Sequence, residues 1–197
     1  MVRSIAAIVI ATISTTAFAQ TPTRNRGTVE QVDGNTLTIK ARSGELIKIK
    51  VPDNVVVVGI TKASIADIAS GKFIGTTTVG QRDGALVAEE IHIFPEAMRG
   101  TGEGHYDWDL RPNSKMTNAN VADISSMGKD RVMTVKYKGG EKKILVPESA
   151  VVVSFQPTDK SELKPGAQIF SVAQKQPDGS LTAARVNIGL QGQVPPM

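Results

Sequence analysis

The chain has 197 residues, no cysteine, 23 basic and 19 acidic side chains, and only 4% aromatic residues. Without cysteine it forms no disulfide, so its fold must rest on apolar cores. The small, dispersed positive charge and the few aromatic side chains argue against a nucleic-acid-binding protein, in which basic residues cluster beside stacking aromatics.

The first nineteen residues have the pattern of a secretory signal peptide. Arg3 supplies a positive charge, residues 5–13 form an apolar stretch, and Ala-Phe-Ala at 17–19 is a small-x-small cleavage site. The apolar stretch is shorter than the roughly 20 residues that a bilayer span requires. We therefore expect removal of residues 1–19 and a periplasmic protein whose mature chain has no transmembrane segment.

The rest of the chain contains an internal repeat. Residues 51–93 match residues 146–188 at a constant offset of 95 without a gap. With one inserted residue, the match extends back to residues 37–40 and 133–136. A match at a fixed period indicates repeated structural units, so the repeat predicts the architecture.

Apolar and polar residues alternate with period two in both units, which predicts half-buried strands. In the first unit we predict strands at 28–32, 36–40, 46–51, 55–58, 73–79 and 86–94, with a short helical or turn segment at 64–70. In the second unit we predict strands at 131–137, 142–146, 151–155, 169–174 and 181–188. Asp-Gly and Ser-Gly pairs between these runs are typical of hairpin turns.

The predicted fold class is all-β, with two tandem repeats that each form a small closed β-barrel of the OB or SH3-like kind. The first barrel is predicted to span residues 20–94 and the second residues 120–197. A pair of open β-sandwiches is the alternative. Residues 95–119 form an inter-repeat loop between the two units.

This central loop has no counterpart in the repeat. It holds Tyr106, Met98, Met116 and the only tryptophan of the chain, Trp108. A flexible linker lacks large aromatic side chains, so we expect an ordered loop that packs across both barrels. Tyr106 and Trp108 are the candidate ligand-binding residues.

The same loop contains a candidate metal site. Glu103, His105, Asp107 and Asp109 alternate, so on an extended segment their side chains project to one side. One imidazole with carboxylates suits zinc or another divalent first-row transition metal. The alternative is a solvated loop face that holds no ion.

No motif in the chain predicts catalysis, so we expect a protein that is not an enzyme and needs no cofactor. Glu89 and Glu90 are adjacent on a predicted strand and point to opposite faces, so they are expected to lie on a solvated strand. His92 alternates with Ile91 and Ile93 and is predicted to face solvent. The scattered methionines are expected to fill gaps in packing.

Three segments of the chain resemble an uncharacterised family of exported proteins from Gram-negative bacteria: residues 27–39, 94–105 and 194–197. The resemblance covers essentially the whole mature chain. It implies a domain of unknown function that is a small β-barrel, and it supplies no catalytic residues. Proteins of this kind are sometimes labelled metal ABC transporter permeases, although a permease needs several membrane spans.

The sequence thus predicts a periplasmic, non-enzymatic binding or scaffolding module of the cell envelope. Its expected partner is an envelope protein, a peptide or a glycan. One alternative is a soluble metal-binding accessory protein that uses Glu103, His105 and Asp107. Another is an oligosaccharide binder in which Tyr106 and Trp108 form a stacking platform.

Overall fold

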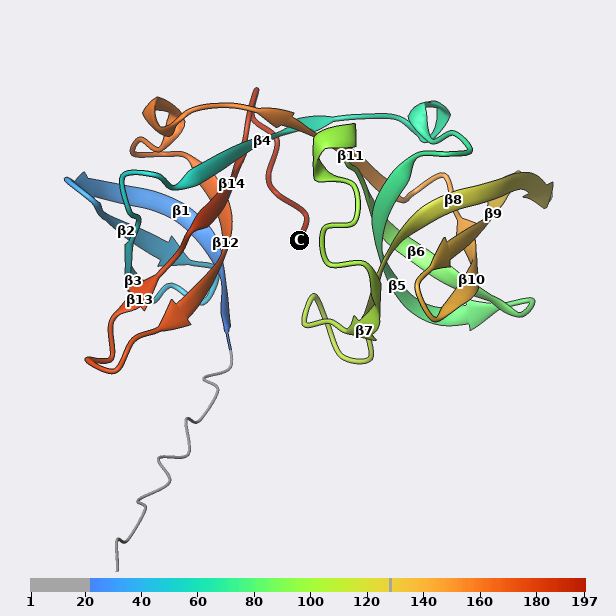
Figure 1. Ribbon diagram of the computed structural model, residues 1–197, viewed down its shortest axis with the longest axis horizontal. Helices are drawn as coiled ribbons and strands as arrows, with labels where there is room; N and C mark the ends of the chain where they lie inside the picture. The colour runs from blue at the N-terminus through green and yellow to red at the C-terminus, as the bar shows by residue number, and fades with distance from the viewer. Residues whose placement is uncertain (1–21, 128) are drawn as a thin grey trace, which may run out of the picture.

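The structure is a computed structural model that describes residues 22–127 and 129–197 (Figure 1). The predicted signal peptide lies outside the described residues. The protein is all-β, as predicted, and its described residues form fourteen strands and three short 3-10 helices. None of the helices in this part of the chain is long and apolar enough to span a membrane.

Five strands close into a ring that forms the first barrel, on the left in Figure 1. In order around the ring they are β1 (Thr23–Asp33), β2 (Thr36–Ala41), β3 (Leu46–Lys50), β13 (Leu181–Thr182) and β12 (Gln168–Lys175). The ring closes where β1 pairs antiparallel with β12, with Gly27 opposite Ile169. β14 (Arg185–Gly189) continues beside β12 after β13.

A second ring of five strands forms the barrel on the right in Figure 1. Its members are β5 (Phe73–Arg82), β6 (Ala85–Ile93), β10 (Gly140–Val146), β9 (Asp130–Tyr137) and β8 (Lys115–Met127). β5 closes the ring by pairing antiparallel with β8. The short strand β7 (Gly104–Asp107) pairs with the first half of β8. These closed rings exclude the open sandwiches.

Two strands cross between the barrels: β4 (Val56–Lys62) and β11 (Val151–Pro157). They pair antiparallel with each other. β4 also runs parallel to β14, and β11 runs parallel to β6. Because β4 connects β3 to β5 and β11 connects β10 to β12, each crossing strand carries the chain from one barrel into the other.

The predicted barrel boundaries, 20–94 and 120–197, are therefore wrong, because each barrel combines strands from both halves of the sequence. Residues 23–50 form the first barrel together with 168–182, and residues 73–93 form the second together with 115–146. Period-two alternation predicts strands and hairpins, but it does not determine which of two similar copies supplies a neighbouring strand. Similar units can exchange an element at low cost, as in domain swapping.

The predicted central loop also differs from the observed one, since β8 begins at Lys115 and not after residue 119. Asn118 and Asn120 in this strand are weak strand formers, which hid it from the sequence pattern. The three 3-10 helices are η1 (Ile65–Asp67), η2 (Glu96–Met98) and η3 (Lys160–Glu162). η1 lies within the segment predicted to be helical or a turn.

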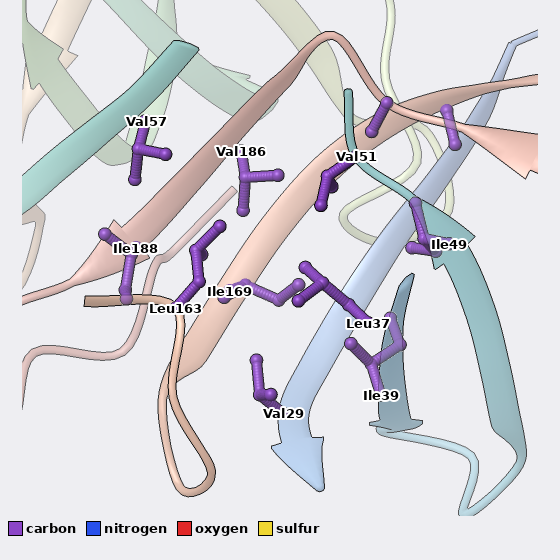
Figure 2. Close-up of a cluster of buried hydrophobic side chains, with 12 residues drawn as sticks. Val29, Leu37, Ile39, Ile49, Val51, Val57, Leu163, Ile169, Val186 and Ile188 are labelled. Atoms are coloured by element: carbon purple, nitrogen blue, oxygen red, sulfur yellow. The ribbon is translucent and has the colours of Figure 1, made fainter. Parts of the chain in front are cut away.

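Each barrel has an aliphatic interior, shown for the first barrel in Figure 2. Leu37, Ile39 and Ile49 there are fully buried, and Ile91 and Ile144 occupy the equivalent interior of the second barrel. A third buried cluster lies between the barrels and takes its residues from β4, β5, the end of β6, β11, β12 and the C-terminal segment: Val58, Ile60, Phe73, Phe94, Val153, Phe155, Phe170 and Met197. This junction is aromatic, whereas the barrel interiors are aliphatic.

Candidate functional site

The outer face of the second barrel, toward the junction, is built by the register of three neighbouring strands. His92 on β6 lies opposite Gly75 on β5, and Gly75 lies opposite Asn118 on β8. One step along the strands, Glu90 lies opposite Thr77 in the same way. Side chains two residues apart on a strand share a face, so the register brings Glu90, His92 and Asn118 to one surface.

Gly75 forms the floor between His92 and Asn118. A Cβ atom at this position would lie 2.5 Å from Asn118 Oδ1, 3.1 Å from Phe94 Cε2 and 3.4 Å from His92 Nδ1. The first of these distances is far inside van der Waals contact, so no larger residue fits without moving its neighbours. The side chains of Asn118, Phe94 and His92 therefore pack directly over the glycine.

Above this floor lies a pocket of about 170 Å³ at the junction of the two barrels. Its apolar wall consists of aromatic and thioether side chains from five separate parts of the chain: Phe94, Tyr106, Trp108, Phe155, Phe170, Met98, Met116 and Met197. His92, Thr101, Asn118, Asn187 and the exposed Arg185 contribute polar groups. An apolar pocket with a few convergent polar groups is the usual form of a small-molecule site.

Three buried polar atoms of this pocket have no hydrogen-bond partner: His92 Nε2, Asn118 Oδ1 and Trp108 Nε1. His92 is only 1% exposed and Asn118 only 7%. A buried polar atom without a partner costs about 1–3 kcal/mol, so each calls for an explanation. Asn25 Oδ1 and Ser171 Oγ are also without a partner, but they do not line this pocket. The three pocket atoms provide an acceptor, a donor and an imidazole nitrogen to whatever fills the pocket.

The prediction that Glu90 and His92 face solvent is wrong. Glu90 is 2% exposed, and its Oε1 accepts a hydrogen bond of 2.6 Å from Thr77 Oγ1. The same carboxylate oxygen lies 3.4 Å from His92 Nε2, within ion-pair distance but without hydrogen-bond geometry. The alternation along β6 is as expected, but the face opposite the barrel interior lies against the junction with the first barrel and not against water.

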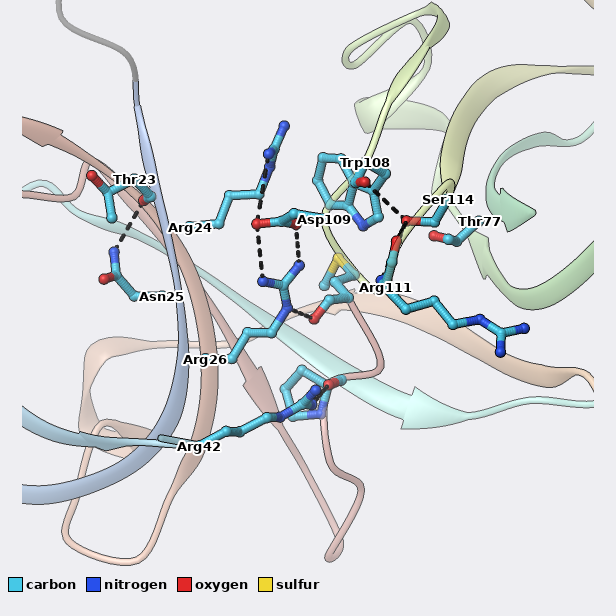
Figure 3. A network of polar contacts seen from close by, with 12 residues as sticks. Thr23, Arg24, Asn25, Arg26, Arg42, Thr77, Trp108, Asp109, Arg111 and Ser114 are labelled. Atoms are coloured by element: carbon cyan, nitrogen blue, oxygen red, sulfur yellow. Dashed lines mark hydrogen bonds and ion pairs between the residues drawn. The ribbon is translucent and has the colours of Figure 1, made fainter. Parts of the chain in front are cut away.

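Trp108 and Tyr106, the two predicted ligand-binding residues, both line the pocket. Their ring centroids are 6.2 Å apart in an edge-on arrangement. Ser114 fixes Trp108, since its hydroxyl donates to the Trp108 carbonyl at 2.9 Å (Figure 3). Burial raises the pKa of Tyr106, and the nearby Arg24 charge opposes that rise. Tyr106 is therefore a neutral hydrogen-bonding group at physiological pH.

Asp109 fastens the central loop to the first barrel (Figure 3). Its carboxylate lies 2.7 Å from Arg26 and 3.7 Å from Arg24, both on β1. Arg26 also donates through Nε to the carbonyl of Met197. Arg24 stacks on Trp108, with its guanidinium carbon 4.1 Å from the ring centroid. The loop thus contacts both barrels and encloses one side of the pocket.

The three metal candidates do not converge. Glu103 Oε1 accepts from the backbone N–H of Lys138 at 3.0 Å, and Asp107 pairs with Lys115. His105 Nδ1 lies 2.8 Å from Thr117 Oγ1. Across residues 22–127 and 129–197, no group of three or more His, Asp or Glu side chains is arranged to hold a metal ion.

His105 instead lies away from the pocket, over Tyr137, with ring centroids 6.4 Å apart. Burial lowers the pKa of His105, the charges of Lys142 and Lys115 lower it further, and Asp107 opposes them. The imidazole is therefore neutral at pH 7. Alternation correctly separates it from Tyr106 and Trp108, which lie on the pocket side.

Larger hollows lie elsewhere, of about 590 Å³ beside β3, about 630 Å³ beside η1 and about 360 Å³ beside β1. The hollow beside β1 is lined by one buried polar atom without a partner, Asn25 Oδ1, against three at the junction. The first two are lined by none. Both are bordered by exposed lysine and glutamate side chains, which are common on any surface. Size alone therefore does not favour them, and the smaller junction pocket is the better candidate site.

Sequence reasoning identified Tyr106 and Trp108 but missed Gly75, His92 and Asn118. One signal was present in the repeat: position 75 corresponds to Phe170 at the offset of 95, so a glycine stands where the other copy has a large aromatic residue.

Comparison of the chain with protein-family models, curated proteins and solved structures gives no match.

Proposed function

We propose that this protein is an exported, non-enzymatic binding module of the cell envelope whose ligand occupies the junction pocket. The observation that carries the proposal is the set of unpartnered polar atoms of His92, Asn118 and Trp108 inside an apolar pocket. A junction with a purely structural role gains nothing from leaving these atoms unpaired, because each unpaired atom lowers the stability of the fold. The signal-peptide pattern at residues 1–19 supports export.

The ligand is small. A cavity of roughly 150 Å³ holds a molecule the size of benzene, and the junction pocket has about 170 Å³. A role as a binding module also agrees with the hydrogen bonds in the pocket. The Thr77 hydroxyl donates to Glu90 and not to His92, so it is not paired with the imidazole in the way of a serine or threonine nucleophile and its histidine base.

The strand-exchanged barrels are of the size of OB and SH3-like barrels, and we assign both to that general kind. The glycan alternative is less favoured, because Arg24 already covers one face of the Trp108 ring. The accessory-metal alternative at the central loop is also less favoured, because Glu103, His105 and Asp107 each have a separate partner. Both alternatives remain outcomes of the test below.

Trp108 is the only tryptophan, so its fluorescence reports on the pocket alone. We expect at least one of three probes, cyclohexanol, N-acetylglucosamine or the soft cation Ag⁺, to change this fluorescence in a saturable way. Gly75→Ala should abolish or weaken the response, because its Cβ would intrude on Asn118. Gly140→Ala, whose Cβ would meet only Tyr137, is the matched control.

Two results would contradict the proposal. The first is a response to none of the three probes, and the second is a response that Gly75→Ala leaves unchanged. Export is tested separately, by fractionating a Gram-negative host that expresses the full chain. We expect a periplasmic protein that begins at Gln20, and an unprocessed cytoplasmic protein would refute the assigned compartment.

A further inference from the structure

Three methionines that are far apart in the sequence line the same pocket as His92. Met116 lies on β8 and is 3% exposed, Met98 ends η2, and Met197 lies in the C-terminal segment and is 5% exposed. In the sequence these methionines are 18 and 81 residues apart, so no local pattern indicates the cluster. The fold therefore assembles three thioethers around one unpartnered imidazole.

Thioether sulfur and imidazole nitrogen form a soft ligand set. Thioethers select Cu(I) over harder ions, whereas Mg²⁺, Ca²⁺ and Mn²⁺ prefer oxygen ligands. The chain has no cysteine whose thiolate could compete for such an ion. We propose that the junction pocket binds one Cu(I) ion through the imidazole of His92 and the thioethers of Met98, Met116 and Met197. This inference rests on the pocket being the binding site proposed above.

Glu90 gives a further reason for a cation here. Imidazoles that bind metals usually direct their second ring nitrogen to a carboxylate, and His92 Nε2 lies 3.4 Å from Glu90 Oε1. The other nitrogen, Nδ1, lies on the side of Gly75, 3.4 Å from the position of a Cβ atom at that residue. Among the described residues, Glu90 has no Lys or Arg partner.

The elements that carry the four ligands differ in how readily they move. His92 and Met116 stand on paired strands of a closed barrel, which fixes them. Met98 and Met197 lie in a short 3-10 helix and in the C-terminal segment, outside the barrel strands. Methionine side chains are long and flexible, so these two can close on an ion held first by the rigid pair.

The walls of the pocket suit a soft ion as well. Phe94, Phe155 and Phe170 line the same pocket as the methionines and make its wall largely apolar. In such surroundings a strongly hydrated ion such as Mg²⁺, which gives up its water reluctantly, gains little. Zn²⁺ would find one imidazole and no convergent carboxylates or thiolates, which are its usual ligands.

The test is an anaerobic titration of the purified protein with Cu(I) against bicinchoninic acid as a competing chelator. We expect one Cu(I) per chain. Met116→Leu and Met98→Leu should each weaken binding by more than about 10-fold, since even outer partners of metal ligands contribute 10–100-fold. Leucine conserves volume. Met133→Leu, which changes a methionine 1% exposed inside the second barrel, is the control and should leave affinity unchanged.

A second readout uses ¹³C-methyl-methionine NMR with Ag⁺, a redox-inert ion of the same charge. The ε-methyl signals of Met98, Met116 and Met197 should shift on binding, while that of Met133 stays in place. Equal loss of affinity in Met116→Leu and Met133→Leu would overturn the proposal. Zn²⁺ binding as tight as Cu(I) binding, and insensitive to Met116→Leu, would also overturn it.

The result distinguishes this inference from the proposed function. If cyclohexanol or N-acetylglucosamine changes Trp108 fluorescence and Cu(I) does not bind, the pocket is a binding site and the Cu(I) assignment is wrong. If neither the neutral probes nor the ions bind, both proposals fail. If Cu(I) binds and depends on Met116, both are supported.

Discussion

The last strand of the repeat occurs twice, once as β6 and once, interrupted, as β13 and β14, and only one copy carries buried ionisable groups. Both copies run parallel to a crossing strand in the same register, since Glu90 lies opposite Val151 and Arg185 lies opposite Val56. Glu90 is nevertheless buried, whereas Arg185 is exposed. The two copies share a backbone frame, and the chemistry of the site is confined to one of them.

The neighbouring strands β5 and β12 show the same contrast in volume. The side chains of His92 and Asn118 pack over Gly75, while Phe170, at the equivalent position of β12, projects its ring into the junction. His92, Asn118 and the Phe170 ring all line the pocket. The difference at equivalent positions therefore places polar side chains on one side of the junction and an aromatic ring on the other.

Removing the large member of this pair should have the largest effect. Phe170 is 3% exposed, and Phe170→Ala should lower the free energy of unfolding by about 3–5 kcal/mol, the usual cost of truncating a buried aromatic ring. Urea unfolding followed by Trp108 fluorescence measures the change. Leu46→Ala, at a site 63% exposed, is the control and should stay within about 0.5 kcal/mol of the unchanged protein. A similar loss in both variants would show that Phe170 does not hold the junction.

Neutralising the buried acid of β6 should have the opposite sign. Glu90→Gln keeps an acceptor for Thr77, removes a buried charge, and places an amide donor near His92 Nε2. We expect the ligand-free protein to become more stable by about 1–3 kcal/mol and to lose Cu(I) affinity. Both are measured at pH 7, by urea unfolding and by chelator competition.

The adjacent acid gives the matched control. Glu89 lies at the register shift of β6 and pairs with Arg111 at the surface, so Glu89→Gln should change stability by less than about 1 kcal/mol. A loss of stability in Glu90→Gln would mean that the carboxylate is a net structural contact. The buried carboxylate would then distinguish β6 from β14 only through its packing.

Much of the fold follows from local pattern, and the junction does not. Alternation and glycine turns predicted the hairpins, because each depends on residues close in sequence. The exchange of strands between barrels was missed, since two similar copies can satisfy the same pairings. His92 was misplaced for a related reason: alternation shows that two faces differ, but it does not show that a second barrel covers the polar one.

The pocket residues illustrate the same limit of local reasoning. Tyr106 and Trp108 were identified because large aromatic residues are unusual in a linker. Met197 lies 99 residues beyond Met98, so only the closed fold brings them together. Asn118 looked like loop sequence because asparagine is rare in strands. Asn118, which weakened the strand prediction for β8, is therefore also one of the residues that line the pocket.

The smallest expected effect concerns Asp109, which fastens the central loop to β1 only on the side of the first barrel. Burial raises the pKa of Asp109, but the hydrogen bonds and charges of Arg26 and Arg24 outweigh it, so the net pKa is lowered. The stabilisation is therefore complete above the unfolded pKa, about 3.9, and is lost as the pH falls through the lower folded pKa. Because the carboxylate is 45% exposed, Asp109→Asn should cost at most about 1 kcal/mol at pH 7, with the difference shrinking below pH 4 and in high salt. Urea unfolding at pH 7 and pH 3 measures it, and a difference that persists unchanged at pH 3 would show that the loop is held by Trp108 packing and not by this ion pair.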